Sequence, residues 1–128
     1  MDHAAEFEAV AGVIAEYFDG LYHSDTRRLA RVFHPMAQYV CATDGTLLYR
    51  TMAEYFPVVD ARPAPAARGE VRADRIVSIE FAGPVTARAV LNCAIGARYF
   101  TDYLTFIKEG GRWQVISKVF HYEEREAG

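Results

Sequence analysis

Apolar residues recur every three or four positions along residues 3–22, which is the spacing of one face of an α-helix. This stripe consists of Phe7, Val10, Ile14, Tyr17, Phe18 and Leu21. A shorter stripe follows in TRRLARVF, with Ser24 as the expected N-cap and His34-Pro35 as the expected end, because proline cannot continue helical hydrogen bonding. The pattern therefore predicts two consecutive helices at the start of the chain.

After the second helix the period of the apolar residues shortens to two, as in β-strands. The runs AQYVCAT and TLLYR flank Asp44-Gly45, a dipeptide typical of hairpin turns. A third helix is expected over residues 51–59, where Thr51 can form a capping box with Glu54.

Residues 60–70, DARPAPAARGE, are expected to be a plain connector, and a lid over a pocket is the alternative. Four strands joined by short turns follow, and Gly110-Gly111 separates the last two. Helices followed by an antiparallel meander indicate an α+β fold, with residues 1–128 as one domain. Long strands on short turns twist strongly, so we expect a curved antiparallel sheet wrapped around the helix 3–22, a cone-shaped α+β barrel.

Composition and charge exclude some classes of function but do not identify one. The 128 residues are 52% hydrophobic with a net charge of −3, which gives no general attraction to nucleic acid or to an anionic membrane. Cys41 and Cys93 lie in apolar runs without CxxC spacing and are expected to be reduced core residues. With neither a basic-apolar leader nor an apolar run of about 20 residues, a cytoplasmic protein is expected. No motif calls for a metal or another cofactor, and we expect none.

Asp102 stands out because it shares one strand face with Phe100, Leu104 and Phe106. If this face is internal, burial favours the protonated carboxyl, which can donate a hydrogen bond to an oxygen that gains negative charge. The alternative is a structural ion pair with Lys118 on the next strand.

The hairpin register decides what lies beside Asp102, and alternation leaves it open. A two- or four-residue loop places Val119 and His121 on the same face as Asp102. A three-residue loop with a bulge instead places these residues there: Ile116, Lys118 and Phe120.

The opposite face of the same strand carries Tyr99, Tyr103 and Ile107, with Thr101 and Thr105 between them. An apolar, threonine-rich sheet face that no helix covers suggests a partner surface. A homodimer through this face is the simplest symmetric solution.

In its element order the chain resembles the nuclear transport factor 2-like superfamily, and most of all its SnoaL-like and lumazine-binding group. The matching stretches are YFDGLYHSD, RLARVFHPMAQY, RPAPAARGE, FTDYL and GRWQVISKVFHYE. The resemblance implies a cone-shaped fold, but this scaffold carries isomerases, polyketide cyclases, dehydratases and binding modules.

Ketosteroid isomerase is the most informative relative in this superfamily. Its helix tyrosine and protonated strand aspartate, which form an oxyanion hole, correspond by resemblance to Tyr17 and Asp102. Its base position is occupied here by Cys41, so the carboxylate base is missing and steroid isomerisation is not implied. The resemblance favours the register that brings Lys118 to the pocket.

We therefore expect a pocket that binds a small, mostly apolar, oxygen-bearing molecule. The expected ligand-binding residues are Phe33, Tyr39, Cys41, Tyr55, Phe56, Phe100, Leu104, Ile116 and Phe120. The first alternative is a cofactor-free isomerase, cyclase or dehydratase in which Tyr17, Asp102 and Lys118 are catalytic. In that case Tyr17 and Asp102 stabilise an enolate-like oxygen, and the proton is moved by Lys118 or by a histidine, His34 or His121. The second is a structural or protein-binding dimer module.

Overall fold

The structure, a computed structural model, describes residues 2–125. Helices and strands follow one another in the order α1 (His3–Tyr22), α2 (Thr26–Val32), β1 (Phe33–Cys41), β2 (Leu48–Thr51), α3 (Met52–Ala61), β3 (Arg75–Phe81), β4 (Thr86–Ile95), β5 (Arg98–Glu109) and β6 (Arg112–Glu124). The three expected helices, the first hairpin and the final four strands are all present.

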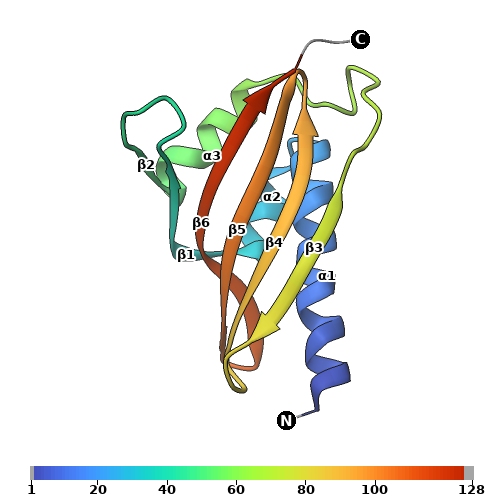
Figure 1. Cartoon of the computed structure of the whole chain (residues 1–128), viewed down its shortest axis with the longest axis vertical. Helices are drawn as coiled ribbons and strands as arrows, with labels where there is room; N and C mark the ends of the chain where they lie inside the picture. Colours follow the sequence, from blue (N-terminus) through green and yellow to red (C-terminus); the bar gives the residue numbers. More distant parts are fainter. Residues whose placement is uncertain (1, 126–128) are drawn as a thin grey trace.

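The strands form one twisted sheet in the order β2-β1-β6-β5-β4-β3, and α1 and α2 lie against one of its faces (Figure 1). This arrangement confirms the α+β prediction. The sheet is mixed rather than wholly antiparallel, because β1 runs parallel to β6. It also stays open: its edge strands β2 and β3 are not paired with each other, and six strands are fewer than the roughly eight of a small closed barrel.

The helix starts follow the capping residues, with one correction. Thr51 and Glu54 form the expected capping box at the start of α3. The N-cap of α2 is Asp25, whose carboxylate accepts from the first-turn amides, and not Ser24. Ser24 has a φ of 47° and makes the turn between the helices instead. The helix also ends at Val32, before the expected His34-Pro35, because β1 already begins at Phe33.

Close packing of α1 against α2 depends on Gly20. A Cβ atom built there would lie 2.6 Å from Cδ2 of Leu29, which is fully buried. The absence of a side chain therefore lets the two helices pack closely against each other.

The β5–β6 hairpin combines a two-residue turn with a bulge, which differs from the three-residue loop considered above. Glu109 pairs with Arg112 around Gly110-Gly111, both of which have positive φ. Farther along β6 the register shifts, and Ile116 is the extra residue between positions that pair with β5.

Beyond this bulge, toward the end of β6, the register is the one favoured by the resemblance, with Lys118 and Phe120 on the same face as Asp102. Asp102 pairs with Phe120, and Leu104 pairs with Lys118. Both Asp102 and Lys118 are buried on the face that α1 covers, whereas Val119 is exposed on the other face. None of the helices within residues 2–125 is long and apolar enough to span a bilayer.

Candidate functional site

Asp102 is fully buried, and α1 supplies its partner. The hydroxyl of Tyr17 donates to Oδ2 over 2.5 Å, and Sγ of Cys93 lies 3.9 Å from the same oxygen. The other oxygen, Oδ1, is buried without a hydrogen-bond partner among the described residues. A buried acceptor of this kind costs about 1–3 kcal/mol when it stays unpaired, so Oδ1 is an unused binding group in the interior.

Lys118 lies beside this carboxyl but does not touch it, since no ion pair within 4.0 Å joins it to any described carboxylate. Its ammonium instead lies 4.9 Å from the ring centre of Phe120 and 5.2 Å from those of Tyr17 and Tyr39, within cation–π range. Burial lowers the pKa of Lys118, but the charge of Asp102 together with the neighbouring Tyr55, Tyr39 and Cys93 outweighs it, and the pKa is raised overall. Lys118 is therefore an ammonium donor rather than a free amine nucleophile.

Neighbouring thiol and phenol groups keep their protons. Burial, followed by the charge of Asp102, raises the pKa of both Cys93 and Tyr17. A buried neutral thiol is a poor nucleophile, so Cys93 serves as part of the wall.

The internal cavity at this site is much smaller than the hollow expected from the sequence. Its volume is about 10 Å³, roughly the space of one water molecule. The residues that line it are Leu21, Tyr39, Tyr55, Arg62, Cys93, Ile95, Phe100 and Lys118. The interior is filled because Tyr39 and Tyr55 stack with ring centres 4.3 Å apart.

The structure brings together only part of the predicted site. Tyr39, Tyr55, Phe100 and Lys118 line the cavity. Tyr17 and Asp102 are joined to each other among the buried residues, and the ring of Phe120 lies under the Lys118 ammonium.

The remaining predicted ligand residues have other surroundings. Phe33 is buried against Tyr17, Tyr55 and Phe56. Leu104 is a fully buried core residue, Ile116 is the bulged residue, and the thiol of Cys41 bonds the Thr43 hydroxyl at the end of β1. Local periodicity identified these residues as apolar, but it could not say which of them border a cavity.

Both histidines considered above lie outside the cavity lining. His34 contacts Glu109 over 3.1 Å at the turn end of the hairpin. His121 lies on the exposed sheet face and contacts Thr43 over 2.9 Å. Neither is placed to move a proton at Asp102.

Arg62 is the residue that sequence reasoning missed. It caps the C-terminal end of α3 and lines the cavity. Its Nε and Nη2 atoms are shielded from solvent and have no hydrogen-bond partner within the described part of the chain. The only sequence signal is an arginine just before the first proline of the connector, which is too common to indicate a site.

In the structure the connector extends over residues 62–74, between α3 and β3. The amide of Ala66 donates to the carbonyl of Tyr22 over 2.9 Å, and the Tyr22 hydroxyl donates to the carbonyl of Glu70 over 2.7 Å. The amide of Gly96, in the β4–β5 turn, donates to the Glu70 carboxylate over 2.8 Å. The connector thus joins the end of α1 to the β4–β5 turn of the sheet.

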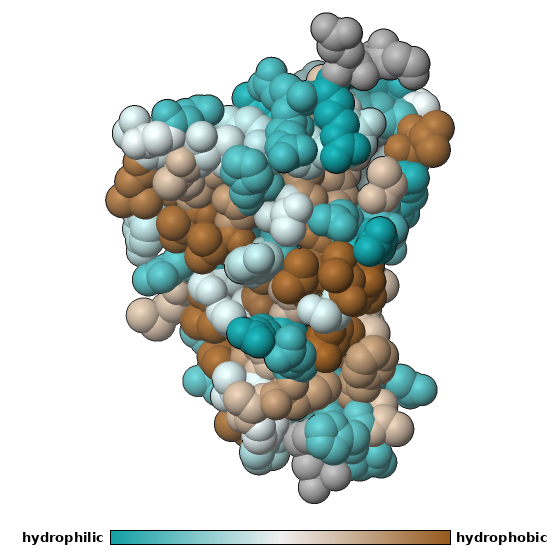
Figure 2. Space-filling model, in the orientation of Figure 1, coloured by the Kyte–Doolittle hydropathy of each residue, from teal (hydrophilic) through white to brown (hydrophobic). Residues whose placement is uncertain are grey.

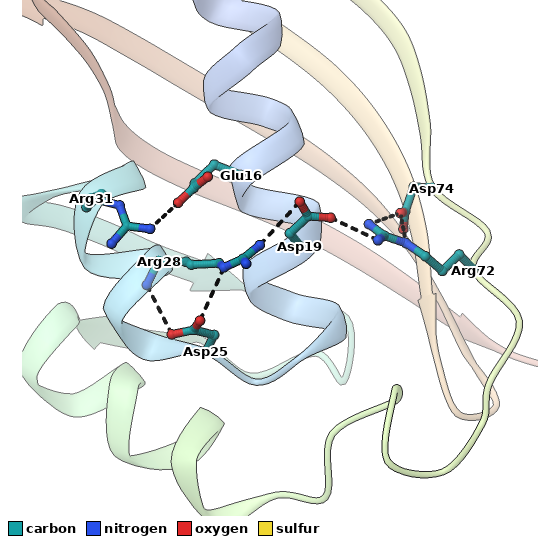
Figure 3. Close-up of polar contacts among 7 residues, drawn as sticks. All are labelled: Glu16, Asp19, Asp25, Arg28, Arg31, Arg72 and Asp74. Atoms are coloured by element: carbon teal, nitrogen blue, oxygen red, sulfur yellow. Dashed lines mark hydrogen bonds and ion pairs between the residues drawn. The ribbon is translucent and has the colours of Figure 1, made fainter.

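An ion-pair network holds the far end of the connector. Figure 3 shows the guanidinium of Arg72 between Asp19 of α1 and Asp74, with contacts of 2.9 and 2.6 Å. Asp19 also pairs with Arg28 of α2, so the same carboxylate ties both helices to the connector. Because these side chains are partly exposed, each pair contributes at most about 1 kcal/mol, which is compatible with a connector that opens.

The fold is that of NTF2-like proteins, as the sequence predicts. An NTF2-like protein of unknown function from Shewanella baltica is 24% identical, with a TM-score of 0.86 over 98% of this chain and 99% of that chain. A second, from Silicibacter pomeroyi, is 22% identical, with a TM-score of 0.84 over 96% and 100%. A ketosteroid isomerase-like protein from Erwinia carotovora atroseptica has a TM-score of 0.74 at 9% identity, over 98% and 100%.

Residues 5–121 match the model of the family described as putative lumazine-binding, and the chain belongs to that family. Aldolase FrzH from Cladobotryum sp is 24% identical over 118 residues, which are 92% of this chain and 92% of that protein. The family and the fold define a cone-shaped scaffold of ligand-binding type.

Proposed function

We propose that this protein binds a small, mostly apolar, oxygen-bearing molecule between Lys118 and the Asp102–Tyr17 pair. The observation that carries the proposal is the set of polar groups with unused hydrogen-bonding capacity in an otherwise apolar interior. Asp102 keeps one oxygen unpaired, and the Lys118 ammonium lies against aromatic rings rather than a carboxylate. Groups of this kind in an aromatic site suit a ligand with a carbonyl or hydroxyl group.

Enzymatic activity is the second candidate, favoured by the likeness to a protein named an aldolase. Removing a proton from the carbon next to a carbonyl requires a base and a positive group near the oxygen that becomes an enolate. In this proposal Asp102 takes the proton, Tyr17 holds the carboxylate, and the Lys118 ammonium stabilises the enolate oxygen.

Titration with acetophenone, an aromatic ketone with exchangeable methyl protons, tests both candidates in one experiment. We expect it to shift the NMR signals of Tyr39, Tyr55 and Phe100, and Lys118→Met to weaken binding about tenfold, because a hydrogen bond to a charged group is lost. Deuterium incorporation into the methyl group in D₂O, abolished in Asp102→Asn, would indicate the enzyme.

Lys108→Met is the matched control, because Lys108 pairs with Glu6 outside the cavity. It should leave acetophenone binding unchanged. Binding that is absent from the wild type, or equally strong in Lys118→Met with intact near-UV circular dichroism, would contradict the binding proposal.

We also propose that the exposed sheet face forms a homodimer. One row of apolar side chains crosses five paired strands: Val90, Tyr103, Val119, Val40 and Tyr49. Figure 2 shows hydrophobic residues gathered in the middle of the face on which the strands lie in front of the helices. A second copy of the same face is the partner that matches such a row, since twofold symmetry sets it against itself.

The oligomeric state is measured by sedimentation velocity. We expect a dimer at micromolar concentration for the wild type and a monomer for the double variant Tyr103→Lys/Val119→Lys, because two pairs of like charges would face each other. Val71→Lys, at a residue that is 91% exposed on the connector, should remain dimeric. A monomeric wild type would rule out the dimer.

A further inference from the structure

We infer that the ligand of the internal site carries a carboxylate, or an equivalent planar anionic group, and that Arg62 binds it. This inference rests on the proposed function and specifies the class of ligand. It follows from the position of Arg62, from its unpaired nitrogen atoms and from the charge balance around the cavity.

Arg62 is oriented as a residue that lacks its partner. Two nitrogen atoms of its guanidinium, Nε and Nη2, are buried, and neither donates a hydrogen bond to a described residue. These two atoms lie on one edge of the planar group, the edge that binds both oxygens of a carboxylate in parallel. The other arginines of the connector, Arg68 and Arg72, are paired with Glu70 and with Asp19 and Asp74.

Charge at the site is unbalanced in the direction that favours an anion. Arg62 and Lys118 both line the cavity, and Asp102 is the carboxylate whose charge acts most strongly on Lys118. A third cation, Arg50, lies 5.7 Å from the ring centre of Tyr39 on the same side. One negative group on the ligand would offset part of this positive excess, and in a buried site such pairing is worth more than at the surface.

Arg62 and Lys118 would contact different parts of the ligand. Arg62 is located where the connector begins, and Lys118 on the central strand β6 beside the Asp102–Tyr17 pair. A bound anion would therefore place its charged group at Arg62 and its apolar body or carbonyl toward Lys118. The cavity has a volume of only about 10 Å³. A ligand that reaches from Arg62 to Lys118 must therefore displace the aromatic side chains or the connector.

Benzoate and benzamide test the inference, because they share their shape and differ in charge. NMR titration of the ¹⁵N-labelled wild type is expected to give a Kd for benzoate at least about tenfold lower than that for benzamide. Arg62→Gln should bring the ratio close to one while the Kd for benzamide stays the same. Arg62→Lys, which keeps the charge but not the planar edge, should give an intermediate ratio even if Arg62→Gln fails to fold.

Arg68→Gln is the matched control, an arginine of the same connector that pairs with Glu70, and it should keep the wild-type ratio. Equal Kd values for benzoate and benzamide in the wild type would overturn the inference, and so would a wild-type ratio of the two Kd values in both Arg62 variants. In either case, binding of one of the compounds would leave the proposed function in place. Failure of both compounds to bind would reject the two together.

Discussion

Replacing Asp102 by leucine is expected to lower the free energy of unfolding by about 3–5 kcal/mol, because it leaves the charge of Lys118 buried without compensation. Asp102 is fully buried, and Lys118 is 4% exposed. The substitution also removes the acceptor of the Tyr17 hydroxyl, which becomes a second unpaired buried group. The loss can be measured by urea unfolding followed through the fluorescence of Trp113, the single tryptophan.

The double variant Asp102→Leu/Lys118→Met separates charge from packing. Replacing both members of a buried pair by apolar residues of similar size is often neutral or stabilising, so most of the lost stability should return. The prediction fails if the free energy of unfolding of the single variant falls by less than about 1 kcal/mol, or if the double variant is no more stable than the single one. Either result would mean that Asp102 does not compensate the buried charge of Lys118.

Alkaline pH is expected to destabilise the protein steeply. Burial and the charge of Asp102 raise the pKa of Tyr17 and of Cys93, and the same charge raises the pKa of Lys118 against the effect of burial. In the unfolded chain these groups lose their protons near pH 8.5 for the thiol, about 10 for the phenol and about 10.4 for the amine. The folded state keeps the protons longer, so their stabilising contribution is present below those values and is lost as the pH rises.

Each such group removes about 1.4 kcal/mol per pH unit from the free energy of unfolding. The loss should begin near pH 8.5 and become steeper above about pH 10 as the tyrosine and the lysine join. Cys93→Ala should flatten the slope between these two values by about 1.4 kcal/mol per pH unit, whatever its effect on stability at neutral pH. Urea unfolding at a series of pH values measures the slope, and an unchanged slope in Cys93→Ala would contradict the assignment.

The helices, the hairpins and the alternation that places Asp102 on one strand face with Phe100, Leu104 and Phe106 were predictable from the sequence, because each depends on residues close in the chain. The apolar stripe of residues 3–22 and the capping box at Thr51 specify helices wherever they are placed. The period of two around Asp102 specifies a strand with one buried face. These features are local, and the structure shows them with only small shifts at their ends.

The hairpin register depended on more than its turn. Gly110-Gly111 forms the two-residue turn that by itself would bring Val119 to the face of Asp102. The bulge at Ile116 reverses this and brings Lys118 to the inner face. A bulge is decided by packing of the whole strand against its neighbours, so alternation along β6 could not place it.

The sequence alone thus determined the helices and strands, their order and the fold class, because the hydrophobic period and the turn residues depend only on residues close in sequence. Only the tertiary structure decided that Lys118 lies beside Asp102, that aromatic rings fill the interior, and that Arg62 lines the cavity from the end of α3. The physical reason is that these positions are set by packing of the sheet against the helices, which joins residues as far apart in the chain as Tyr17 and Asp102.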